Sequence, residues 1–114
     1  VNGDELRGWS PVCSPSGAPS ARGYSTGVSH EGSLWVFGGS AGSSRKNDLQ
    51  RFDLAARTWH TVDFQGDPPS ARNSHSAVVY GDCLYVFGGW DGSANCNDLY
   101  ECNLKTSVWR AVGA

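Results

Sequence analysis

Residues 34–39 read LWVFGG, and residues 84–89 read LYVFGG, fifty positions further along the chain. The same spacing separates further matching segments: Pro-Ser-Ala-Arg at 19–22 and 69–72, Asn-Asp-Leu at 47–49 and 97–99, and Trp-x-x-Val at 59–62 and 109–112. Aligned without a gap, residues 19–64 and 69–114 share 18 of 46 positions. A match of this length indicates two copies of one repeating unit.

Each unit contains the pattern of four short β-strands. In the second unit we expect strands at residues 76–80, 84–87, 98–104 and 108–112, separated by glycine, asparagine and serine turns. No segment shows a helical period of ten residues. The sequence therefore predicts an all-β fold of four-stranded antiparallel units. Because one such unit cannot bury both of its faces, we expect the units to stack side by side as propeller blades.

The repeated motifs resemble those of the kelch-repeat β-propeller family: a strand that ends in the double glycine, then Asn-Asp-Leu-x-x-x-x-Leu, then a tryptophan. The resemblance covers residues 9–114, since Trp9-x-x-Val12 lies fifty positions before Trp59-x-x-Val62. It implies a partial propeller of two complete blades plus one outer strand. We expect residues 1–18 to hold the outer strand of a preceding or closing blade and a linker, residues 19–68 the first blade, and residues 69–114 the second.

Seven residues have expected structural roles in this arrangement. The glycine pairs permit close approach of the backbone and dihedral angles that other residues resist. The tryptophans are expected on the outer strand of each unit, where they would cover the glycine step. These residues are Gly38, Gly39, Gly88, Gly89, Trp9, Trp59 and Trp109.

Composition argues against several classes of function. The chain has 9 Lys and Arg against 11 Asp and Glu, a formal charge of −2, whereas nucleic-acid-binding domains are usually basic. The sequence has no apolar run of about 20 residues and no signal sequence. We therefore expect no membrane partner, and we expect a cytoplasmic location. The four cysteines contain no Cys-x-x-Cys spacing and are expected to be reduced.

Residues 38–42 read GGSAG and match the Gly-x-Ser-x-Gly pattern of a nucleophilic serine. That motif requires a helix after the turn, but a polar loop and a strand are expected here. The second unit has Gly-Gly-Trp90-Asp-Gly at the same place, so it keeps the three glycines and loses the serine. We therefore expect no catalytic residue. The three histidines are dispersed, so no metal ligand and no cofactor are expected either.

The expected strand order places two kinds of loop at one end of the blades: those that precede the first strand and those that join the second and third strands. We call this end the long-loop face, formed by residues 40–46, 64–73 and 90–96. The turns at the other end are short. The candidates for protein binding on the long-loop face are Arg22, Arg45, Lys46, Arg72, Asn73, Trp90, Asp91 and Asn95.

Alternatives stay open for these candidates. Arg22 and Arg72 repeat between the units, so a structural role in bonding loop carbonyls is as well supported as contact with a partner. Trp90 is replaced by Ser40 in the first unit and either contacts a partner or packs on its own loop. For Arg45 and Lys46, simple solvation is the commoner role of such residues.

The resemblance implies a non-enzymatic protein–protein interaction module, used as a substrate adaptor or a scaffold. The alternative is part of a kelch-like metal-dependent enzyme or specifier protein that uses copper or iron. The expected partners are another protein and, to close the ring, the remaining blades of the same chain or copies of this chain.

Overall fold

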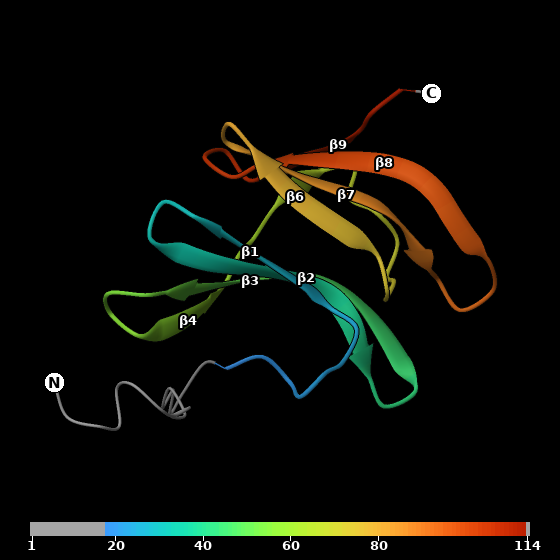
Figure 1. The fold of residues 1–114 in the computed structure, drawn as a ribbon, viewed down its shortest axis with the longest axis horizontal. Helices are drawn as coiled ribbons and strands as arrows, with labels where there is room; N and C mark the ends of the chain where they lie inside the picture. Colours follow the sequence, from blue (N-terminus) through green and yellow to red (C-terminus); the bar gives the residue numbers. More distant parts are fainter. Residues whose placement is uncertain (1–17, 114) are drawn as a thin grey trace, which may run out of the picture.

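The computed structural model describes residues 18–113, which form two separate sheets, antiparallel except for one short parallel pair, and no helix (Figure 1). The predicted outer strand at residues 9–12 lies outside this range. The first sheet has the order β1 (Thr26–His30), β2 (Ser33–Ala41), β3 (Ser44–Asp53) and β4 (Thr58–Thr61). The second has the order β5 (Gln65–Gly66), β9 (Val108–Ala111), β8 (Asn95–Asn103), β7 (Cys83–Trp90) and β6 (Ser76–Tyr80). The predicted four-stranded antiparallel units are confirmed.

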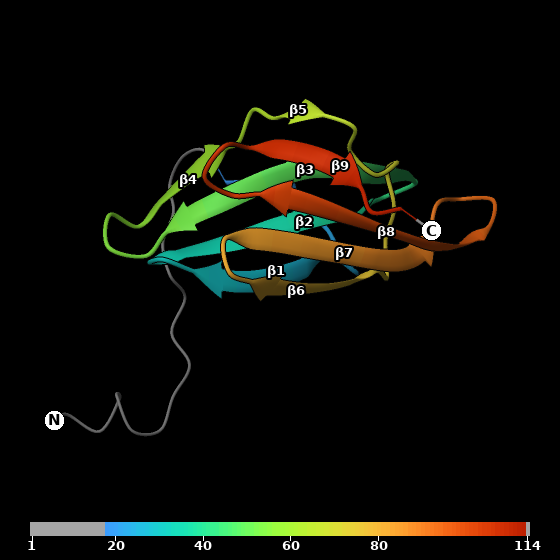
Figure 2. The ribbon, with the colours of Figure 1, turned by 90° about the horizontal axis from the view of Figure 1, so that it is seen from above.

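The two sheets lie one on the other as neighbouring blades. Strands β1 and β6 run along the same edge of the pair, and β4 and β9 lie toward the opposite edge (Figure 2). The core fills the space between the sheets. Its buried side chains come from both blades: Trp35, Phe37, Leu49, Leu84, Val86, Cys102, Leu104 and Trp109. Residues 18–113 form two blades that do not close a ring (Figure 1).

The double glycine lies at a β-bulge in each blade. The register between the second and third strands shifts between Phe37 and Gly39, and again between Phe87 and Gly89. Gly38 has φ +67° and Gly39 has φ +104°, in the left-handed region that side chains disfavour. A Cβ atom on Gly38 would lie 2.9 Å from the carbonyl oxygen of Arg72. Glycine is therefore required both for the dihedral angles and for the close approach of the next blade.

Strand β5 was not predicted from the sequence. Gln65 and Gly66 pair in parallel with Val108 and Trp109, so this two-residue strand extends the second sheet at its outer edge (Figure 2). Residues 65–66 belong to the first unit in the predicted division at residue 68, yet they bond to the second blade. The division itself stays a prediction.

The two repeated tryptophans lie on the predicted strands but differ in burial. Trp109 on β9 is 1% exposed, and its ring packs against Phe37 of the first blade at 5.1 Å between centroids. Trp59 on β4 is half-buried and packs against Phe52 at 5.0 Å. A Cβ atom on either glycine of the second pair would come nearest to Cys96, Asn73 and His75, and not to Trp109. Trp109 thus covers the neighbouring blade rather than the glycine step of its own blade.

This difference in burial predicts unequal effects of two matched substitutions. We expect Trp109→Ala to lower the free energy of unfolding by about 3–5 kcal/mol, because it opens a cavity in the core between the blades. Trp59→Ala should cost clearly less, since part of that ring already faces solvent. Urea unfolding followed by circular dichroism measures both. Equal losses, or a loss below about 1 kcal/mol for Trp109→Ala, would contradict the packing described here.

Candidate functional site

The loops of the long-loop face meet in pairs. We call residues 18–25 and 67–75 the lead-in loops, because each precedes the first strand of its blade. In the first blade Gly23 forms a β-bridge with Ser40, and in the second Asn73 forms one with Trp90. The lead-in loop and the loop between the second and third strands therefore lie at the same end of each blade, as the sequence predicted.

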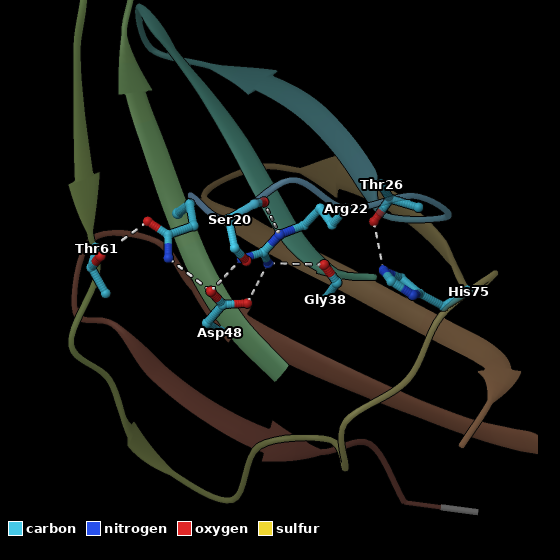
Figure 3. Close-up of polar contacts among 8 residues, drawn as sticks. Ser20, Arg22, Thr26, Gly38, Asp48, Thr61 and His75 are labelled. Atoms are coloured by element: carbon cyan, nitrogen blue, oxygen red, sulfur yellow. Dashed lines mark hydrogen bonds and ion pairs between the residues drawn. The ribbon is translucent and has the colours of Figure 1, made fainter. Parts of the chain in front are cut away.

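Arg22 ties its lead-in loop to strand β3. Its Nη1 donates to the Asp48 carboxylate at 2.6 Å and to the carbonyl oxygen of Gly38 at 3.1 Å (Figure 3). Its Nη2 donates to the second Asp48 oxygen at 3.0 Å and to the hydroxyl of Ser20 at 3.1 Å. Burial alone would raise the pKa of Asp48, but the bonds from Arg22 and Gln50 outweigh it and lower that pKa.

Arg72 repeats this arrangement in the second blade. Its Nη1 donates to the Asp98 carboxylate at 2.6 Å and to the carbonyl oxygen of Gly88 at 2.9 Å. The hydrogen bonds from Arg72 lower the pKa of Asp98. Arg72 is only 1% exposed. The geometry of both arginines therefore fits the structural alternative, and their contact with a partner stays a prediction.

The second lead-in loop also forms the seam between the blades. The carbonyl oxygen of Arg72 accepts from Gly39 N at 2.9 Å, and Arg72 N donates to the carbonyl oxygen of Lys46 at 3.0 Å. The side-chain amide of Asn73 donates to the hydroxyl of Ser40. Asn73 and Ser40 have no counterpart of the same type in the other repeat. The sequence placed both in the loops of the long-loop face, and here they join the two blades.

His75 lies buried in the same seam. Its Nε2 is 2.8 Å from the Thr26 hydroxyl (Figure 3), and its ring meets Phe37 edge-on at 5.3 Å between centroids. Burial lowers the pKa of His75 below the usual 6.5, and the charge of Arg72 acts in the same direction. This histidine therefore stays neutral in the folded protein near neutral pH.

The remaining predicted residues line the rim of the long-loop face. Trp90 is 38% exposed. Asp91 Oδ1 accepts from the backbone N–H groups of Ser93 and Ala94 at 2.8 and 2.9 Å, and these bonds lower its pKa. The Asp91 carboxylate therefore stabilises the turn of its own loop. Asn95 is exposed.

The two other basic candidates, Arg45 and Lys46, lie at the start of β3, not in a loop. Arg45 and Lys46 are half-buried there. A Cβ atom on Gly92 would lie 2.7 Å from Arg45 Nη2, so the guanidinium rests against the loop of the next blade. The main chain of Lys46 takes part in the seam through its carbonyl oxygen.

Sequence reasoning missed Tyr24 in the first lead-in loop. Its side chain is 74% exposed, the residue has φ 60°, and Ser74 replaces it in the second repeat. An aromatic residue that appears in only one repeat was the signal used for Trp90. Applied to the lead-in loops, the same criterion finds Tyr24.

Comparison with known proteins agrees with this geometry. A family model described as the KLHDC2/KLHL20/DRC7 Kelch-repeats domain matches residues 5–114. The chain belongs to this kelch-repeat family. No curated protein matches the chain. Kelch-repeat domains generally mediate protein–protein interactions and are typically non-enzymatic. Residues 18–113 include no helix of the length and hydrophobicity needed to cross a bilayer.

The second kelch blade has a pocket where the first is filled. This pocket of about 250 Å³ is lined by Phe87, Gly88, Gly89, Trp90 and Cys96, with Ser74, Ser76 and Asn95. In the first kelch blade, the positions equivalent to Gly88, Gly89 and Cys96 contact residues 72–75. Phe37 is accordingly 1% exposed, whereas its equivalent Phe87 is 51% exposed.

The buried His75 predicts a dependence of stability on pH. The unfolded chain binds a proton at His75 near pH 6.5, and the folded chain binds it only at a lower pH. The unfolded state therefore holds more protons below that pH, so the free energy of unfolding should fall as the pH drops from about 7 to 5. His75→Gln should flatten this dependence, and His60→Gln, at an exposed position, should not. Urea titrations at several pH values test this, and equal slopes in both variants would contradict it.

Proposed function

We propose that this kelch-repeat chain is a recognition module that binds a protein partner through the long-loop face, as a substrate adaptor or a scaffold. The observation that carries the proposal is the exposure of two aromatic side chains at positions that differ between the repeats, one in the first lead-in loop and one at the end of strand β7. Tyr24 is 74% exposed and Trp90 is 38% exposed. Exposed tyrosine and tryptophan side chains are frequent anchors of protein interfaces.

The positions of these residues support a continuous surface. Tyr24 follows Gly23, which pairs with Ser40. Ser40 accepts a hydrogen bond from Asn73, and Asn73 pairs with Trp90. This series of contacts crosses the seam and connects the lead-in loop of Tyr24 with the end of strand β7 at Trp90. Arg45, Asp91 and Asn95 lie on the neighbouring segments and would form the polar rim that such interfaces usually have.

Substitution of the two aromatic residues tests the proposal. We expect Tyr24→Ala and Trp90→Ala in the full chain each to weaken binding of captured partner proteins by roughly tenfold, the effect of losing about 1.4 kcal/mol. The midpoint of thermal unfolding should shift by less than about 4 °C, since neither ring is buried. Affinity capture with quantitative mass spectrometry measures the first effect, and calorimetry measures the second.

Tyr80→Ala provides the matched control. Tyr80 is 81% exposed but ends strand β6 beside the short turn at the other end of the blade. Its substitution should leave the captured proteins unchanged. Loss of binding in Tyr80→Ala alone, or normal binding in both loop variants, would place the interface elsewhere.

We also propose that a third blade, supplied by the same chain or by a copy of this chain, covers the free face of the second blade. The face carries a second pocket of about 380 Å³, lined by Asn97, Asp98, Leu99 and Tyr100 together with residues 111–113. The equivalent of Asn97 in the first blade is Asn47, whose amide donates to the carbonyl oxygen of the buried Pro69 at 3.4 Å. Both pockets thus correspond to places that residues 69–75 fill in the first blade. A docked blade would lie beside Trp90, as Asn73 lies beside Ser40, so Trp90 would form the edge of the recognition surface at that seam.

Amide exchange at the glycine pair tests this second proposal. The amide of Gly39 bonds to Arg72 across the seam. If a further blade docks in the same way, we expect the amide of Gly89 in the full chain to exchange with deuterium as slowly as that of Gly39. Protection that disappears on dilution would identify a copy of the chain, and protection independent of concentration would identify the same chain. Fast exchange of Gly89 at all concentrations would contradict the proposal.

A further inference from the structure

The short turns opposite the long-loop face bring three potential metal ligands together. His30 and Glu31 lie at the β1–β2 turn, and Asp82 lies at the β6–β7 turn of the other blade. One ligand atom from each residue lies within 4.8 Å of the other two. His30 Nε2 is 3.3 Å from Asp82 Oδ1 and 3.7 Å from Glu31 Oε2. The three groups therefore surround one small volume at the seam between the blades.

The imidazole of His30 lacks an ordinary partner in this volume. Its Nε2 atom is buried, and among residues 18–113 it has no hydrogen-bond partner. The side chain as a whole is 15% exposed. Buried polar atoms of native proteins nearly always have a partner, whether protein, water or an ion. The position of the buried Nε2 between two carboxylates is one that a bound cation would satisfy.

We propose that His30, Glu31 and Asp82 bind a zinc ion that links the two blades. Zinc takes imidazole nitrogen and carboxylate oxygen ligands at about 2.0–2.2 Å in tetrahedral geometry, which separates neighbouring ligand atoms by about 3.4 Å. The two observed distances from Nε2 bracket this value. Three protein ligands leave the fourth position of the tetrahedron to water.

The surroundings leave room for the ion. A pocket of about 240 Å³ adjoins the cluster and is lined by His30, Glu31, Ser33, Trp35, Arg51, Leu104 and Lys105. The ammonium of Lys105 lies 4.0 Å from Glu31 Oε2, and its side chain is 60% exposed. An exposed ion pair of this kind contributes little free energy, so Lys105 can release the carboxylate to the metal. Lys105 therefore competes with zinc for Glu31.

Zinc titration of the full chain tests the site, after removal of metal with a chelator and with a reductant present. We expect calorimetry to show binding of one zinc ion that also raises the midpoint of thermal unfolding, because the ion links two blades of the folded state. His30→Gln and Asp82→Asn should each weaken zinc binding at least tenfold. Lys105→Ala should strengthen it, since it removes the competing charge.

His60→Gln is the matched control, because it removes an exposed histidine from the outer strand β4 and should leave zinc binding unchanged. Circular dichroism shows whether each variant folds, and if His30→Gln does not fold, Asp82→Asn and Lys105→Ala decide. The proposal is overturned if zinc up to about 100 µM does not bind. It is also overturned if binding is the same in the folded variants as in the unchanged chain, which would assign the zinc to other groups such as the cysteines.

Discussion

The contact between the main chain of residues 72–75 and the double glycine of the first blade is the constraint on which the rest of the structure depends. Gly38 and Gly39 remove two side chains, and the carbonyl oxygen of Arg72 occupies that space and accepts from Gly39 N. This approach brings the second blade close enough for Phe37 to meet His75 and Trp109. The same contact therefore positions both the core between the sheets and the loops of the long-loop face.

The repeated arginines explain why the same contact can be rigid. The main chain of Arg72 bonds to the first blade, while its guanidinium bonds to Asp98 and Gly88 in the second. Movement of the loop relative to the first blade would break these backbone hydrogen bonds, and movement relative to the second would break the charge-assisted bonds of the guanidinium. Residues that repeat thus hold the fold. The residues that differ between the repeats have other roles: Asn73 forms the hydrogen bond across the seam, and Tyr24 and Trp90 provide the exposed aromatic side chains.

The sequence predicted the strands and the blades because the fifty-residue repeat and the strand patterns are local signals. It also predicted which loops share a face, since strand order alone decides that. It could not predict β5, whose polar residues pair only because Trp109 lies beside them. The sequence could not decide between a structural role and a partner contact for Arg72, because the burial of this side chain depends on the neighbouring blade. It missed the cluster of His30, Glu31 and Asp82 because each repeat supplies different ligands from the same turn, so no repeated pattern marks them.

Equivalent positions in the two repeats therefore have equal chemistry and unequal environments. Phe37 and Phe87 occupy the same place in their strands, yet one is 1% exposed and the other 51% exposed, because among residues 18–113 only the first blade has a neighbour on that face. Exposure of a repeated apolar residue is thus a sign of an uncovered blade face. The exposure of Tyr24 has a different cause. Its equivalent in the second repeat is a serine, so packing of the blade does not require an aromatic ring at this position. In a repeat protein, the exposed residue without a counterpart is the stronger indicator of recognition.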